Sequence, residues 1–75
     1  MLKTVDHRRV RLTPHVQSGQ PGYMYEVYAA QGSGVCHGWA AGSEDEATRG
    51  AIEHADDVYR SRLRAATLAR KARAI

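Results

Sequence analysis

SEDEATRGAIEHADDVYRSRL, residues 43–63, carries the strongest helix signal in the chain, and the residues before it are best explained as strands that pack against this helix. Its first four residues match a capping box, in which the Ser43 hydroxyl can accept from the backbone N–H of Glu46 and the Glu46 carboxylate can accept from that of Ser43. Small and apolar residues then recur every three or four positions, namely Ala47, Ala51, Ile52, Ala55, Val58, Tyr59, Leu63 and Ala66. At about 100° per residue they share one side of a helix. We therefore predict a helix over residues 43–72 that buries this side.

Charges are unevenly distributed along this predicted helix. Residues 43–59 hold six acids and one base, whereas residues 60–75 hold six bases and no acid. The helix dipole favours acids near the start of a helix and bases near its end, so this charge distribution can be explained in part without a binding partner. Thirty helical residues would span roughly 45 Å, but a strand of six or seven residues spans only about 20–23 Å. We expect the buried part to end near Leu63, and residues 66–75 to overhang the sheet as a basic helix end. Arg62 supports this limit, because it falls within the apolar side of the helix, where a core-facing residue would be expected.

Three stretches before the helix are typical of strands. Residues 9–17 alternate between apolar and polar, residues 23–30 are rich in Tyr and Val, and residues 35–41 follow a glycine-rich turn. Pro14 cannot donate to a strand ladder, so we expect it at a sheet edge or a bend. Residues 1–8 are expected to be a loose leader. The prediction is a single α+β domain over residues 1–75, a three-stranded antiparallel sheet packed on one long C-terminal helix (β-β-β-α).

The pairing of the last two predicted strands decides which residues stay outside the core. Across a four-residue turn at 31–34, we expect Tyr28 to pair with His37 and Glu26 with Trp39. The core face then holds Tyr25, Val27, Ala29, Cys36, Gly38 and Ala40. The open face holds Arg9, Arg11, His15, Met24, Glu26, Tyr28, His37 and Trp39. A slip of one residue would exchange the faces and bury the lone carboxylate of Glu26, which is costly.

Composition points to a small intracellular protein that needs a partner. The chain has 75 residues, no Phe and one Trp, so its core is marginal and a homodimer or a larger partner is expected. Its only cysteine, Cys36, cannot form an internal disulfide, which favours a reducing, cytoplasmic setting. The first ten residues contain no apolar run, and this is unlike a signal peptide or a membrane span. A net charge of +3 allows nucleic acid or an acidic protein as partner.

No catalytic or metal-binding arrangement emerges from the residues. The four histidines have no ligand spacing with one another or with Cys36. The glycine-rich residues 31–34 join two strands, whereas a phosphate loop joins a strand to a helix. We expect no enzyme activity, no metal and no cofactor. The residues expected to bind a partner are Arg9, Arg11, Tyr28, His37, Trp39, Arg60, Arg64 and Lys71.

Two residues in this scheme have alternative interpretations. Trp39 is either partly core or an exposed aromatic anchor beside Tyr28 and Met24. Gly50 falls on the outer side of the helix, where Ala would be favoured by about 1 kcal/mol. It is either an unselected surface glycine or a place where another molecule approaches the backbone.

Residues 38–43 (GWAAGS), followed by Ala47 and preceded by Pro21-Gly22 and Tyr25-Glu26-Val27, resemble a small anti-CRISPR protein of the type I-F group. The similarity covers about half the chain, from Pro21 to Ala55. It implies a phage or mobile-element product that acts in the bacterial host cytoplasm. Such a protein would bind a type I CRISPR interference complex and block its activity without catalysis. Because this chain is basic, the resemblance implies contact with protein or guide RNA in preference to mimicry of DNA.

Residues 23–63 are also similar to the β-β-β-α part of double-stranded-RNA-binding domains, which implies direct nucleic-acid binding as an alternative. That family opens its last helix with a Lys-Lys-x-Ala-Lys pattern that contacts phosphates. Here the matching positions are Glu44, Asp45 and Glu46, which would repel phosphate, and the family's first helix is missing. HicB-type antitoxins share the Gly-Ser-x-x-Glu-Ala helix start found at residues 42–47, but they usually append a DNA-binding module.

Overall fold

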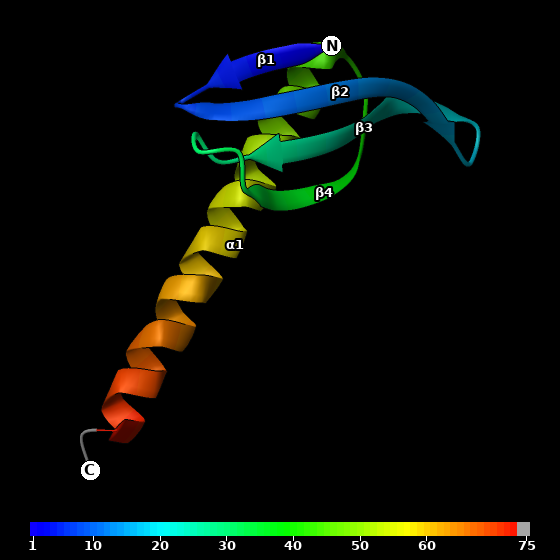
Figure 1. Cartoon of the computed structure of the whole chain (residues 1–75). Helices are drawn as coiled ribbons and strands as arrows, with labels where there is room; N and C mark the ends of the chain where they lie inside the picture. The colour runs from blue at the N-terminus through cyan, green and yellow to red at the C-terminus, as the bar shows by residue number, and fades with distance from the viewer. Residues whose placement is uncertain (74–75) are drawn as a thin grey trace.

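The computed structural model describes residues 1–73 as a four-stranded antiparallel sheet covered on one side by one helix (Figure 1). The strands are β1 (Leu2–Val5), β2 (Arg8–Gln17), β3 (Gln20–Tyr28) and β4 (Gly34–Ala41), and they lie side by side in that order. The helix is α1 (Glu44–Arg73), and no helix in this part of the chain is long and apolar enough to cross a membrane. The predicted α+β class is confirmed, with four strands where three were expected.

The additional strand is β1, so the prediction of a loose leader over residues 1–8 is wrong. β1 joins β2 through a two-residue loop, Asp6 and His7, whose φ values are +49° and +65°. Two left-handed residues give a turn whose twist matches that of paired strands, and Asp and His tolerate this conformation better than most residues. The Met1 amine donates to the Leu12 carbonyl at 3.1 Å, and the Leu12 N–H donates to the Met1 carbonyl at 2.8 Å. These bonds anchor the first residue to the sheet.

A second tight hairpin joins β2 to β3. Its loop is only Ser18 and Gly19, again with positive φ values of +52° and +77°, and Gln17 pairs with Gln20 across it. The connection between the strands predicted over residues 9–17 and 23–30 is therefore shorter than expected, and β3 begins earlier in the chain. As a result, β2 and β3 form a long ribbon that extends past the other two strands (Figure 1).

Pro14 lies in β2 just beyond the residues that pair with the start of β1. β1 pairs with β2 as far as Arg11, and Leu12 uses both its N–H and its carbonyl to bond Met1. Backbone groups two residues apart in a strand point to the same side. The nitrogen of Pro14 therefore points to the free edge of the sheet, where the missing N–H leaves no ladder bond unmade. The predicted edge position of Pro14 is confirmed.

β3 and β4 pair in a register two residues away from the predicted one. Glu26 lies opposite His37 and not opposite Trp39. Next to the loop, Tyr28 lies opposite Gly34, three residues from its predicted partner, and the bulge between Val27 and Tyr28 reduces this shift to two residues along the rest of the ladder. A shift of two residues leaves each side chain on its original face, whereas a shift of one would exchange the faces. The predicted pairing is therefore wrong, although the predicted assignment of faces is confirmed.

One face of the sheet packs against the first half of α1. The core residues alternate along β2 and β3 and recur every four positions in α1: Val10, Leu12, Tyr25, Val27, Ala47, Ala51 and Ala55. Gly38 of β4 makes room for the ring of Tyr25, since a Cβ there would lie 2.6 Å from the tyrosine oxygen. Gly50 is not on the outer side as predicted. It is half-buried, and a Cβ there would meet the Cβ of Ala40 at an ordinary 3.6 Å.

Hydrogen bonds and ion pairs fix the first half of α1 to the sheet. The predicted capping box is present, with both bonds between Ser43 and Glu46 at 3.2 Å. The backbone N–H and the hydroxyl of Ser43 lower the pKa of the Glu46 carboxyl. Lys3 of β1 pairs with Glu44 at 2.5 Å, a hydrogen bond that raises the pKa of the lysine. Arg8 of β2 pairs with Asp56 at 2.6 Å.

The second half of α1 projects beyond the sheet (Figure 1). Packing ends earlier than the predicted limit near Leu63, because Tyr59 is already 61% exposed and Leu63 is 50% exposed. Every side chain from Tyr59 to Lys71 is exposed. We call residues 59–73 the projecting half of α1. The last two residues of the predicted overhang, 74–75, lie outside the described residues.

Candidate functional site

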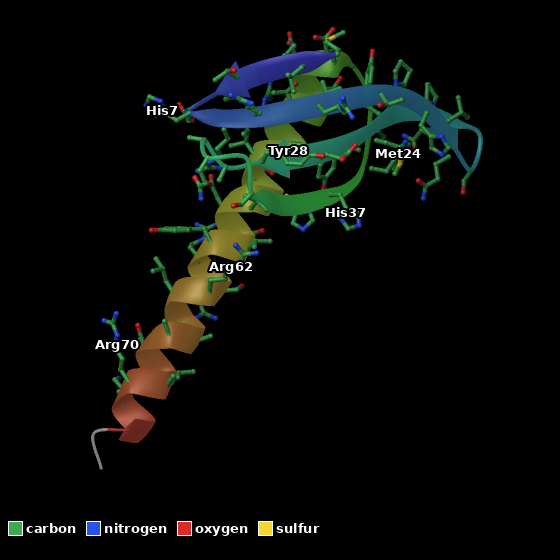
Figure 2. All side chains as sticks on the ribbon, in the orientation of Figure 1. His7, Met24, Tyr28, His37, Arg62 and Arg70 are labelled. Carbon is green, nitrogen blue, oxygen red and sulfur yellow. The ribbon has the colours of Figure 1, made fainter. Side chains whose placement is uncertain are left out.

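The face of the sheet turned away from α1 is the first candidate surface, and we call it the open face. Side chains alternate between the two faces of a strand. Because Val10, Leu12, Tyr25 and Val27 are buried beneath α1, their neighbours along the chain must point the other way. The predicted partner-binding residues on this face are Arg9, Arg11, Tyr28, His37 and Trp39. In Figure 2, Tyr28, Met24 and His37 lie on the sheet, whereas Arg62 and Arg70 lie on the projecting half.

A shallow hollow of about 490 Å³ lies on β3 and β4, lined in part by Met24, Glu26, Tyr28 and His37. The Tyr28 hydroxyl donates a hydrogen bond to a Glu26 carboxylate oxygen, and this bond is the main reason why the pKa of Tyr28 is raised. His37 is exposed and lies opposite Glu26 in the ladder. The bond to Tyr28 fixes the Glu26 carboxylate against its own strand.

The positive part of the open face lies on β2, next to Tyr28. Arg9 pairs with Tyr28 across β2 and β3, and Arg11 is close enough for its charge to oppose the rise in the pKa of Tyr28. Both arginines and Tyr28 line a second hollow of about 260 Å³, together with Leu2 and Gly32. Leu2 reaches this hollow from β1, a strand that the sequence pattern does not predict. Two guanidinium groups beside an aromatic ring can bind a carboxylate or a phosphate.

Trp39 connects three strands at the end of the open face far from Arg9 and Arg11. Its indole N–H donates to the backbone carbonyl of His15 at 3.0 Å, so the side chain reaches from β4 over β3 to β2. The ring covers Gly22, where a Cβ would lie 2.8 Å from a ring carbon and 2.3 Å from the carbonyl oxygen of Ala40. Trp39 is half-buried by these contacts, while Met24, opposite it, is 40% exposed. Trp39 is therefore on the open face as predicted, and it also holds the sheet together.

The predicted site residues on the helix are not brought together with those on the sheet. Ala47, Ala51 and Ala55 face the sheet. Arg60 is five residues beyond Ala55, roughly 140° further round the helix at 100° per residue, and Arg64 follows one turn later on the same side. This side points away from the sheet, whereas the open face lies beyond the sheet on the opposite side of the molecule. The eight predicted residues therefore form two separate surfaces.

A tyrosine–histidine pair that the sequence does not indicate lies on the covered face. The Tyr25 hydroxyl and His54 Nδ1 are 2.7 Å apart, and the rings meet edge-on with centroids 5.8 Å apart. Burial raises the pKa of Tyr25 and also that of the half-buried Cys36 thiol, so both stay protonated at neutral pH. This pair connects β3 to α1 beneath the helix, away from both candidate surfaces. Within residues 1–73, no three His, Cys, Asp or Glu side chains gather in a way that could hold a metal ion.

The geometry thus offers an open sheet face with arginine and aromatic side chains, and a separate basic helix that projects from the core. No protein-family model, no curated protein and no solved structure matches this chain.

Proposed function

We propose that this protein is a non-catalytic binding module whose open face docks onto a protein or ribonucleoprotein complex. The observation that carries the proposal is the combination of Arg9 and Arg11 with Tyr28 on a sheet face that no other part of the described chain covers. Arginine and large aromatic residues are enriched in the centres of interfaces, where they supply most of the binding free energy. An uncovered sheet face with these residues favours a partner.

The chemistry of the face favours a partner with acidic groups. Glu26 is the single acidic residue among the strand residues of the open face, and its carboxylate accepts from Tyr28. The remaining charge comes from Arg9 and Arg11, so a carboxylate or phosphate of the partner would fit the hollow between them. The exposed Met24 at the other end would contact an apolar patch.

The first partner we propose is a type I CRISPR interference complex, which the protein would inhibit by occupying part of its surface. This follows the sequence resemblance to type I-F anti-CRISPR proteins, and a net charge of +3 favours contact with acidic protein surface or guide RNA. Binding to double-stranded RNA through the start of α1 has less support. The Glu44 carboxylate there pairs with Lys3, and Asp45 and Glu46 add further negative charge.

Binding to a purified type I-F interference complex tests the proposal. The wild-type protein should bind and lower target cleavage, while Arg11→Glu should weaken binding at least about tenfold, as expected for a charge reversal at an interface. Arg49→Glu is the matched control, because Arg49 is exposed on α1 and makes the same change in net charge away from the open face. Tyr28→Ala should also weaken binding, with circular dichroism confirming that the variant is folded.

Two results would contradict the proposal in different ways. If no type I complex binds, the proposed partner is wrong. If the complex binds but Arg11→Glu and Arg49→Glu behave alike, the interface is not on the open face. A dimer of the free protein that Arg11→Glu dissociates would mean that two open faces pair with each other.

A further inference from the structure

We propose that the projecting half of α1 is a second, independent binding element that inserts into the major groove of duplex DNA. This inference does not depend on the partner of the open face, because it rests on different residues on a different part of the molecule. Three features carry it: the length of unsupported helix, the positions of its basic residues, and the positions of its apolar residues.

The projecting half has the dimensions of a groove-binding helix. Residues 59–73 are helical, every described side chain among them is exposed, and at 1.5 Å per residue they extend roughly 22 Å. Only at their start do Tyr59 and Arg62 border a hollow of about 350 Å³ that Arg8 and Val35 of the sheet also line. In Figure 1 the helix beyond this start runs away from the sheet with no other element beside it. The major groove of DNA, about 12 Å wide, admits one α-helix without other structure around it.

Basic residues surround the projecting half instead of forming one stripe. Arg62 is two residues from both Arg60 and Arg64, which puts it roughly 160° away from each of them round the helix. Arg70 points roughly 120° from Arg64, and Lys71 returns to the side of Arg60. Among the side chains that the structure describes, Arg60 is the one base of this set in an ion pair, with Asp57 at 2.5 Å. The sequence from residue 60 onwards contains no acid that could neutralise the others.

Bases on opposite sides of one helix fit a partner that carries negative charge on two sides. The walls of a DNA groove are phosphate backbones on both sides of the inserted helix, so both sets of arginines would reach phosphates. A flat anionic surface would contact one set and leave the other in water. The other nucleic acids fit less well, since the deep and narrow major groove of duplex RNA excludes a helix. Single strands bind by stacking on aromatic rings, and Tyr59 is the last aromatic residue in the chain.

The apolar residues of the projecting half argue against a lipid surface. Leu63 and Leu68 are exposed, but they are five residues apart and so point roughly 140° away from each other. An interfacial membrane helix needs one continuous apolar face. The scattered leucines leave electrostatic contact as the main source of affinity, so binding should depend little on DNA sequence and strongly on salt.

Fluorescence anisotropy of the full chain with short labelled nucleic acids tests this inference. Duplex DNA should bind, and with about four phosphates neutralised its affinity should fall about a hundredfold between roughly 50 and 200 mM salt. Duplex RNA should bind at least about tenfold more weakly, because the helix cannot enter its narrow major groove. Single-stranded DNA should also bind at least about tenfold more weakly, because the helix offers its bases too little aromatic surface for stacking. Absence of duplex-DNA binding at the lower salt concentration overturns the inference, as does equal or tighter binding of duplex RNA.

Paired variants distinguish insertion into a groove from contact with one side. Two double variants remove charge from the two sides of the helix: Arg60→Gln with Arg64→Gln, and Arg62→Gln with Arg70→Gln. Each double variant should lower the affinity for DNA by about tenfold and flatten the salt dependence. Arg9→Gln with Arg11→Gln removes the same charge from the open face and should leave DNA affinity within about twofold. If only one pair on the helix matters, the groove model is wrong. If the open-face pair matters most, the projecting half is not the DNA contact. Circular dichroism should show the same helix content in all three variants.

Discussion

The two halves of α1 have the same backbone conformation and opposite surroundings. In residues 44–58, alanines approach the sheet closely, and the capping box and the ion pairs of Lys3 and Arg8 hold the helix in place. In residues 59–73 no side chain is buried among those described, and the helix depends on its own propensity and hydrogen bonds. Isolated helices of this length are marginal in water, so most helical stability normally comes from tertiary packing. A helix that continues past its core does little for folding, which leaves its second half free for binding.

The same substitution in the two halves should give the largest contrast. Ala51 is fully buried between α1 and the sheet, and Ala66 is exposed on the projecting half. Ala51→Leu inserts a large side chain where none fits and should lower the free energy of unfolding by about 2–3 kcal/mol. Ala66→Leu should change it by less than about 0.5 kcal/mol. Urea unfolding followed by circular dichroism measures both, and similar losses would show that the projecting half is packed against something in solution.

Two glycines sharpen the description of the packed half. Gly38→Ala places a methyl group against the Tyr25 ring and its bond to His54, so it should destabilise the protein by about 1–2 kcal/mol. Gly50→Ala meets only an ordinary contact with Ala40 and gains helix propensity, so it should stabilise by about 0.5–1 kcal/mol. Thermal unfolding of the two variants gives the signs. A destabilising Gly50→Ala would mean that the helix lies closer to β4 than the structure shows.

The capping box makes a smaller contribution that depends on pH. The backbone N–H and the hydroxyl of Ser43 lower the pKa of Glu46 from its ordinary 4.5. A carboxyl whose pKa is lower in the folded state adds stability above its ordinary pKa, and this stability is lost as the pH falls through the lowered value. Glu46→Gln should therefore be less stable than the parent at neutral pH, with a difference that closes in acid. Parallel pH dependences of the two proteins would show that the cap does not hold the carboxylate.

The sequence predicts the packed half better than the surfaces around it. The helix over residues 43–72, the three longer strands and the sheet face of each strand residue follow from periodicity, which burial enforces. β1 was missed because Leu2 and Val5 point to opposite faces, so four residues show no alternation. The pair Asp6-His7 is the signal that could have revealed it, since two residues that tolerate positive φ stand between Val5 and the next strand. The register of β3 and β4 differs from the predicted one because the loop between them spans residues 29–33 and not 31–34, and because the bulge at Val27 and Tyr28 has no marker residue.

The sheet face on which each candidate strand residue lies could be predicted, but the arrangement of the candidate residues in space could not. Arg9, Arg11, Tyr28, His37 and Trp39 lie on one face because strand alternation puts them there. Their separation from Arg60, Arg64 and Lys71 depends on how α1 is rotated against the sheet. That rotation is set by the contacts of Ala47, Ala51 and Ala55, which become visible only in three dimensions.

Hydrogen exchange of individual backbone amides along α1, measured by NMR on the free protein, tests the central claim most directly. Amides over residues 48–58 should exchange slowly, because they open only when the core unfolds, and those over residues 60–71 should exchange quickly through local fraying. Uniformly slow exchange along the whole of α1 would contradict the claim, because it would require another surface to cover the projecting half.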